Sequence, residues 1–218
     1  DCVDAEQDVF LRNIHIINML DTNREIKLFM HQVFDIGDSA GNGDTIQYLP
    51  DNKAILTYRG QRAFVIGGNY SNSKAFDQHS VGLFGIEGHD GTFADAEDGI
   101  LANNSVDGRV DSTIGFTLNI APHESARVYY WISVGTNPRE ALDKHEVIQT
   151  QNTALNRILA TSKWWHNWIK PAEHFSQKLD EEFRESFIQS ILLIKSHIDH
   201  HGAVIASTDT TMLHHSRD

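Results

Sequence analysis

The sequence predicts a mainly β protein with C-terminal helices, in which antiparallel sheets pack as a sandwich. Residues 8 to about 135 contain repeated stretches where apolar and polar side chains alternate, as in strands with one buried face. No alternation of helices with strands interrupts them, which disfavours a parallel sheet. From Asn137 onward the apolar spacing becomes three or four residues, which is the period of amphipathic helices.

The strands are predicted from this alternation and from the turn residues between them. Val9 to Ile17 and Arg24 to Ile36 form two strands, separated by Asp21-Thr22-Asn23, a turn-forming sequence. In the second strand, Gln32 alone interrupts the apolar face. Further strands are expected at 54–58 and 63–67, joined by an Arg59-Gly60-Gln61 hairpin loop, and at 114–120 and 128–134. We expect roughly six to nine strands, packed as antiparallel sheets.

The segment from Glu87 to Asp111 is the least regular part of the predicted sandwich. Its acidic residues include Asp90, Asp95, Glu97, Asp98, Asp107 and Asp111. Calcium loops place oxygen ligands at fixed alternating positions with a closing glutamate. Neither the Asp95–Asp98 nor the Asn104–Asp111 spacing matches that pattern. We interpret the segment as a solvated surface loop rather than a metal site.

Helices are predicted after the last strand. Asn137-Pro138-Arg139-Glu140 is a helix start, with Asn as the N-cap and Pro in the first turn. One helical segment is expected to reach about Ile169, with a polar middle from Gln149 to Thr153, and Pro171 is expected to end it. It contains Trp164, Trp165 and Trp168. Such rings stack on sugars, but large aromatic residues also dominate the packing between domains, and we favour domain packing.

A second amphipathic helix is predicted near the end of the chain, from Asp180 to Asp199. Its apolar stripe consists of Phe183, Phe187, Ile191, Ile194 and Ile198. A stop at His200-His201-Gly202 and an apolar run from Ala203 to Ala206 follow it. No other segment after Asp180 supplies helices to cover this stripe. We therefore expect the front portion of a larger protein, with this helix docked on the sandwich or paired with another copy.

Composition limits the partners of the chain. Its 218 residues include 18 Lys and Arg against 30 Asp and Glu, a formal charge of −12. Phosphate binding requires clustered cationic side chains, so nucleic acid is not an expected partner. No apolar run approaches the length of a membrane span. The single cysteine, Cys2, permits no internal disulfide and favours a reducing compartment, the cytoplasm.

The sequence contains no convincing catalytic or metal-binding constellation. Paired carboxylates cleave glycosidic bonds, and three candidates lie on the polar face of the last helix: Glu181, Glu182 and Glu185. A charge run of this kind is typical of a solvated face. Asp209 lies in a Ser/Thr-rich turn, where Asp normally caps backbone amides. His197 and His201 share one helix face but lack the further ligands of a zinc site. We expect no catalytic, cofactor-binding or metal-binding residue.

Two neighbouring stretches resemble the start of the catalytic domain in glycoside hydrolase family 15, the glucoamylase, glucodextranase and trehalase-like enzymes. They are Ser190-Ile-Leu-Leu-Ile-Lys195 and Asp199-His-His-Gly202-Ala-Val-Ile-Ala206-Ser-Thr-Asp209. In that family such a segment precedes a substrate-binding Trp-Pro-Arg-Asp. Arg217-Asp218 lacks the Trp and Pro and is not equated with it. Segments 9–13, 28–32 and 95–111 are similar to the family's N-terminal domain.

The resemblance implies three regions: a β super-sandwich over 1–136, a helical linker over 137–172, and over 173–218 the first helix and following segment of a truncated (α/α)6 barrel. The family's two catalytic glutamates act by inversion and belong to later barrel loops, so this chain is expected to be inactive alone. The implied parent hydrolyses α-glucans or α-glucosides without a cofactor. Its partners are an oligosaccharide and the missing barrel. Substrate-side or interface residues here would be Asp209, Trp164, Trp165 and Trp168.

Two other functions remain as alternatives. A stand-alone carbohydrate-binding sandwich would need an exposed aromatic row, for which the candidates are Tyr58, Tyr70, Tyr129 and Trp131. A disaccharide phosphorylase of similar architecture would require phosphate. Binding without turnover would favour the first alternative, and phosphate-dependent cleavage by the parent would favour the second.

Overall fold

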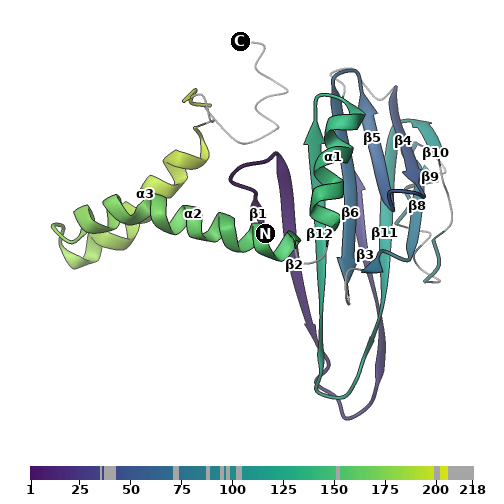
Figure 1. Cartoon of the computed structure of the whole chain (residues 1–218), viewed down its shortest axis with the longest axis horizontal. Coiled ribbons are helices and arrows are strands. Elements are labelled where there is room, and N and C mark those ends of the chain that lie inside the picture. Colours follow the sequence, from purple (N-terminus) through teal and green to yellow (C-terminus); the bar gives the residue numbers. More distant parts are fainter. Residues whose placement is uncertain are drawn as a thin grey trace. The chain divides into compact units, whose positions relative to one another are not determined.

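The computed structural model describes residues 1–34, 36, 43–70, 74–86, 89–93, 96, 99–101, 105–150, 153–198 and 202–205. The chain divides into two compact units, Asp1–Thr161 and Ser162–Asp218. The first unit holds two antiparallel sheets, and helices follow the last strand (Figure 1). The predicted class, mainly β with C-terminal helices, is therefore confirmed.

The sandwich consists of a larger and a smaller sheet. Among the described residues, the larger sheet has eight strands in the order β1-β2-β12-β6-β5-β4-β10, with β7 paired to β6. Their bounds are Cys2–Val3 (β1), Val9–Ile17 (β2), Asp44–Leu49 (β4), Ala54–Arg59 (β5), Arg62–Tyr70 (β6), Lys74–Ala75 (β7), Ser105–Gly108 (β10) and Ser125–Gly135 (β12). The smaller sheet, ordered β3-β11-β8-β9, comprises Arg24–Val33 (β3), Gln78–Ile86 (β8), His89–Asp90 (β9) and Val110–Ile120 (β11).

Two connections cross between the sheets at the same end of the sandwich. The turn from β2 to β3 and the turn from β11 to β12 both join a strand of one sheet to a strand of the other. Asn18, which is buried, ties the two turns together. Its Nδ2 donates to the carbonyls of Thr22 at 2.8 Å, Ile120 at 3.1 Å and Ala121 at 3.0 Å. These bonds supply a buried donor to backbone carbonyls at this end of the sandwich.

The main core lies between the sheets, as the alternation predicts. On β11 the inward residues are Ile114, Phe116, Leu118 and Ile120, all buried. Gln32, the interruption in the apolar face of β3, is buried as well, and its polar groups are satisfied. Ser112 Oγ donates to Gln32 Oε1 at 3.0 Å, and Gln32 Nε2 donates to the carbonyl of Met30 at 2.8 Å. Hydrogen bonding therefore makes a polar side chain tolerable here.

Helix α1, Pro138–Gln149, begins where the sequence predicts. Asn137 Oδ1 accepts from the backbone N–H of Glu140 at 3.0 Å. The Glu140 carboxylate accepts from the Thr136 hydroxyl at 2.7 Å and from the Thr136 N–H at 2.9 Å. Hydrogen bonds from the Thr136 hydroxyl, the Lys144 ammonium and the Thr136 N–H lower the pKa of Glu140 to about 2. The two side chains form a reciprocal cap at the start of α1.

α1 packs on the outer face of the larger sheet, over β6 and β12 (Figure 1). Its buried anchor is His145, which accepts at Nδ1 from Trp131 Nε1 at 3.0 Å. His145 Nε2 then carries the proton and donates to the carbonyl of Asn52 at 3.0 Å. Burial lowers the pKa of His145 below its ordinary value of 6.5. Gly67 leaves room for both rings, since a Cβ there would lie 2.6 Å from His145 Cε1.

The prediction of one helical segment ended by Pro171 is wrong in two respects. α1 ends at Gln149 with Thr150 in an extended conformation, and α2 runs from Thr153 to Ser176. The polar middle of the predicted segment, Gln149 to Thr153, therefore coincides with the end of α1 and the start of α2. Pro171 lies inside α2. Pro171 and Asn167 are exposed, so water can satisfy the Asn167 carbonyl that proline leaves without a helical partner.

The predicted last helix is confirmed with slightly shorter bounds, as α3, Glu181–Ser196, in the second unit. After it, Val204 forms an antiparallel bridge with Ile198, and the N–H of Ile205 donates to the His197 carbonyl at 2.9 Å. Among the described helices, none combines the length and apolar character needed to cross a bilayer.

Candidate functional site

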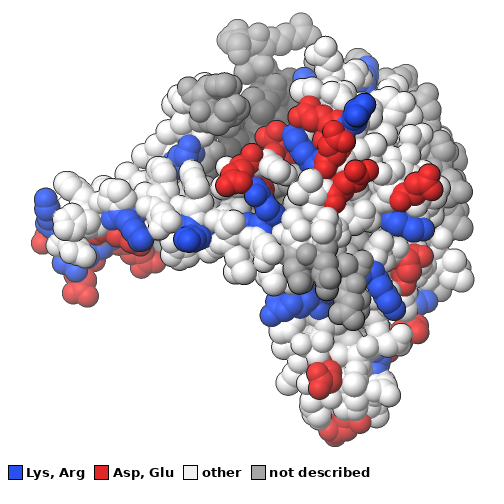
Figure 2. All heavy atoms as spheres, viewed as in Figure 1, with Lys and Arg blue, Asp and Glu red and all other residues white. Residues whose placement is uncertain are grey.

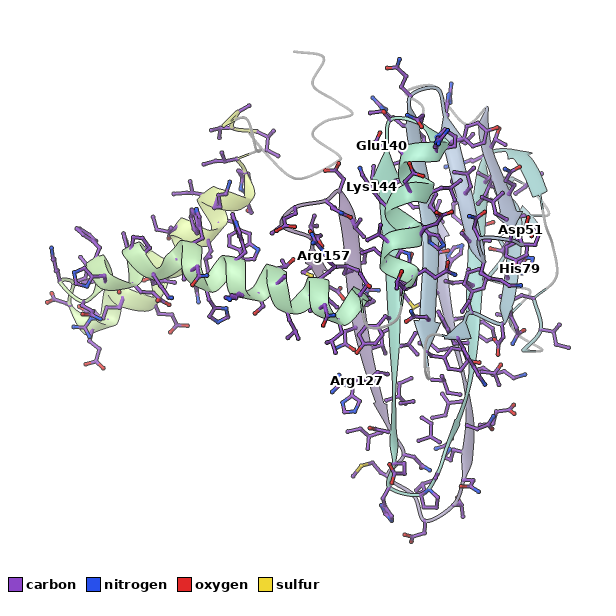
Figure 3. All side chains as sticks on the ribbon, viewed as in Figure 1. Asp51, His79, Arg127, Glu140, Lys144 and Arg157 are labelled. Atoms are coloured by element: carbon purple, nitrogen blue, oxygen red, sulfur yellow. The ribbon has the colours of Figure 1, made fainter. Side chains whose placement is uncertain are left out.

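A buried ion pair fastens the start of α2 to the N-terminal segment. The Arg157 guanidinium donates from Nε and Nη2 to the two carboxylate oxygens of Asp4, and from Nη1 to Glu6 Oε2 at 2.9 Å (Figure 3). Thr161 Oγ1 accepts from the N–H of Ala5 at 3.2 Å. Burial raises the pKa of Asp4, but the hydrogen bonds from Arg157 and the backbone bring it below its ordinary value. Within the first unit, this clamp therefore fastens the start of α2 to the N-terminal segment.

The surface over α1 carries charges of both signs. Figure 2 shows acidic and basic side chains next to one another around this helix on the face in view. Lys144 Nζ lies 3.1 Å from Asp8 Oδ2 and 2.9 Å from Glu140 Oε1. Such a mixed surface is typical of a solvated face and not of a site for a strongly charged ligand.

The three predicted tryptophans lie together on α2, in the second unit. Trp164 and Trp168 are nearly parallel, with ring centroids 6.4 Å apart and an interplanar angle of 12°. Trp165 stands edge-on to both, with centroids at 5.0 Å from Trp164 and 5.8 Å from Trp168. The rings therefore pack on one another, as aromatic clusters do in apolar interfaces. Trp164 is 39% exposed, so part of this cluster remains uncovered.

The apolar face of α3 is only partly covered. None of the residues in α3 is buried. Phe183 is 55% exposed, Leu193 63% and Ile194 57%. Within the same unit, Phe187 contacts Phe175 of α2 with ring centroids 5.6 Å apart. A concentration of large exposed apolar side chains marks an interaction surface. We call α3 with the α2 tryptophans the helical docking surface.

No catalytic constellation emerges among the other predicted residues. Asp209 lies outside the described residues, as do Asp95 and Asp98, whose spacing does not match a calcium loop. Glu181, Glu182 and Glu185 are exposed on α3, as predicted. Within the described ranges, no three His, Cys, Asp or Glu side chains gather so as to hold a metal ion. The described part of the chain thus offers a surface for packing and shows no catalytic centre.

A second group of polar side chains lies on the outer face of the smaller sheet, and the sequence analysis missed it. Asp111 was predicted to lie in a solvated loop, but it belongs to β11 and its side chain is fully buried. Its Oδ2 accepts from His31 Nε2 at 2.7 Å, from the Thr92 N–H at 2.7 Å and from Thr92 Oγ1 at 3.0 Å. Thr92 Oγ1 also lies 2.9 Å from Thr113 Oγ1.

A signal for this group was present in the sequence. Asp111 and Thr113 share the odd-numbered positions of β11, opposite the core residue Ile114 and its even-numbered neighbours. Extending the predicted strand 114–120 by three residues toward the N-terminus would have included Asp111. The contact with Thr92 was not predictable, because it depends on how the segment after β9 folds over the sheet. A carboxylate can be buried here because that segment supplies its donors.

Comparison with solved structures identifies a bacterial glucoamylase, determined in complex with acarbose, as similar to this chain. The match has a TM-score of 0.53 and 12% identity, and it covers 78% of this chain and 24% of the glucoamylase chain. No protein-family model matches the chain, and a search of curated proteins finds no match. At this identity the likeness shows a shared fold: the sandwich and helices follow part of the glucoamylase architecture.

Proposed function

We propose that this chain is the N-terminal, non-catalytic portion of an inverting α-glycoside hydrolase acting on α-glucans or α-glucosides. In this proposal residues 1–136 form the sandwich, 137–172 the linker, and 173–218 the beginning of an (α/α)6 barrel. The observation that carries it is the match of 78% of the chain to only 24% of a glucoamylase chain. The sandwich and helices therefore have a counterpart inside a larger glycosidase.

The helical docking surface supports the proposal independently. An (α/α)6 barrel consists of helices that bury apolar stripes against one another, and α3 presents such a stripe with no residue buried. Burying a side chain such as Phe183 or Ile194 contributes about 1.5–3 kcal/mol. The remaining barrel helices are the proposed occupant of this face. The exposed part of the tryptophan cluster would then pack at the junction, the role that the sequence analysis favoured over sugar stacking.

In this proposal the first unit holds the start of α2 in place. The Asp4–Arg157 clamp and the His145 anchor of α1 hold both linker helices to the sheets. In this proposal the first unit therefore stabilises the beginning of the helical linker. The catalytic acid and base would lie in later barrel loops.

Hydrolysis assays test the proposal. The 218-residue protein is expected to leave maltose, isomaltose and trehalose intact, whereas a protein extended through the reading frame after Asp218 is expected to hydrolyse at least one of them. NMR of the released sugar should show inversion, with β-glucose formed from an α-linkage. Turnover by the 218-residue protein would overturn the non-catalytic assignment, and cleavage only with phosphate would indicate a phosphorylase.

A further inference from the structure

The outer face of the smaller sheet combines exposed aromatic rings with a fixed imidazole. We call this group the His31 patch and define it by His31, Phe84, Phe93, Arg109 and the buried Asp111. His31 pairs with Thr113 in the β3–β11 ladder, and Asp111 lies two residues before Thr113 on β11. Alternate residues of a strand share a face. His31 and Asp111 therefore lie on the side of the sheet opposite the core residue Ile114.

Asp111 fixes the orientation of the His31 ring. The Asp111 side chain is fully buried, whereas the His31 side chain is 30% exposed. Donation from Nε2 to Asp111 Oδ2 at 2.7 Å defines the tautomer of neutral His31 and leaves Nδ1 as the hydrogen-bond acceptor of the ring. The other donors to Oδ2, both from Thr92, hold the carboxylate in place. A ligand that bonds to Nδ1 would therefore meet a group whose conformational freedom is already lost.

Two aromatic rings lie beside this imidazole, and a guanidinium lies over one of them. Phe93 is 49% exposed, and its ring centroid lies 5.4 Å from that of His31 at 61°. Phe84 lies 6.2 Å from His31, and the Arg109 guanidinium lies 5.9 Å from the Phe84 ring centroid. An apolar ring beside a few oriented polar groups is the usual composition of a small-molecule site. Sugars match it, because a pyranose offers a C–H face to the ring and hydroxyls to the polar groups.

We propose that the His31 patch is a binding site for a glucan chain, with Phe93 as the stacking ring and His31 Nδ1 as the acceptor for a sugar hydroxyl. The choice of an α-glucan rests on the proposed function. An apolar protein surface fits this patch less well than a sugar does, because it would form no hydrogen bond with the imidazole that the buried carboxylate orients. Anionic ligands are disfavoured by the formal charge of −12. The aromatic row that the sequence suggested for sugar binding differs from the His31 patch. One of its four candidates, Trp131, is fully buried beneath α1.

Titration with soluble oligosaccharides tests the site. Maltoheptaose and cellohexaose are added to the 218-residue protein, and binding is followed by calorimetry and by amide chemical shifts. Phe93→Ala is expected to weaken maltoheptaose binding about fivefold, through loss of the stacking ring. His31→Gln should weaken it similarly. Leu20→Ala is the matched control: Leu20 is 50% exposed and lies in the turn before β3, so this variant should bind as wild type does.

Each negative result contradicts a different part of the proposal. Absence of any shift at millimolar maltoheptaose, or equal affinity of wild type and Phe93→Ala, overturns the site. Binding of cellohexaose without maltoheptaose overturns its assignment to α-glucans. None of these outcomes bears on whether the extended protein hydrolyses α-glucosides, so the proposed function is judged by its own assay. Phe93 is half exposed, so its truncation is expected to leave folding intact, and urea unfolding of each variant checks this.

Discussion

Replacing His145 with phenylalanine tests the hydrogen-bonded link between α1 and the larger sheet. His145 is fully buried, accepts from Trp131 Nε1 at 3.0 Å and donates to the Asn52 carbonyl at 3.0 Å. Phenylalanine fills a similar volume but leaves the indole N–H of Trp131 buried without an acceptor. The Asn52 carbonyl keeps one partner, because Gln149 Nε2 donates to it at 3.1 Å.

The expected loss follows from these contacts. An unsatisfied buried donor costs about 1–3 kcal/mol, and the lost bond to Asn52 contributes about 0.5–1.5 kcal/mol. His145→Phe should therefore lower the free energy of unfolding by about 2–4 kcal/mol, a large share of the 5–15 kcal/mol typical of a domain. Urea unfolding at pH 8, followed by far-UV circular dichroism, measures it. His15→Phe is the control: His15 is exposed on β2, so its loss should stay within about 0.5 kcal/mol.

The pH dependence provides a second, independent readout. Burial lowers the pKa of His145 below 6.5, so the unfolded chain takes up a proton at a pH where the folded protein does not. The wild-type contribution is therefore complete above about pH 6.5 and is lost as the pH falls below it. The difference between wild type and His145→Phe should shrink from pH 8 to pH 5.5. A difference under about 0.5 kcal/mol at pH 8, unchanged at pH 5.5, would refute the reasoning.

Three further changes have expected outcomes. Gly67→Ala should lower the free energy of unfolding by about 1–3 kcal/mol in the same urea assay, because the new Cβ would lie 2.6 Å from His145 Cε1 and 2.7 Å from the Trp131 ring. Arg157→Met should cost about 2–3 kcal/mol at pH 7, since Asp4 stays buried without its guanidinium. The pKa of Asp4 is lowered, so the wild-type advantage should shrink as the pH falls below about 4 and through that lowered pKa, and an advantage that stays undiminished there would contradict the clamp. Ile194→Ser, at a 57% exposed position of α3, should change the stability of this chain by less than about 0.5 kcal/mol but destabilise a barrel-extended protein in thermal unfolding.

Most of the sandwich was predictable because its determinants are local. Strict alternation in β3 and β11 defined which side chains face the core, and the Asn137-Pro138 pair defined the start of α1. The stripe predicted an amphipathic helix near the end of the chain, and the structure confirms α3, in which no residue is buried. The expected docking of this helix on the sandwich or on another copy stays a prediction. These features depend on neighbours within a few positions, which a sequence displays directly.

Contacts between residues distant in the chain had to come from the tertiary structure. Asp111 was placed in a solvated loop because its acidic neighbours suggested solvent, whereas His31 and Thr92 supply the donors that permit its burial. Pro171 was expected to end a helix, but exposure of its turn to water lets α2 continue. Gln32 interrupted an apolar pattern, and only its pairing with Ser112, 80 positions away, explains why it is buried.

The sequence by itself determined the fold class, the boundary between strands and helices, and the presence of a helix whose apolar side is left for a partner. The tertiary structure decided which polar side chains are buried, which rings meet on the outer face of the smaller sheet, and how Arg157 and His145 fasten the helices to the sandwich. The reason is physical. The spacing of apolar residues in the sequence shows which face of a helix or strand is buried. The free-energy cost of burying one polar group depends on a hydrogen-bond partner that folding brings from elsewhere in the chain.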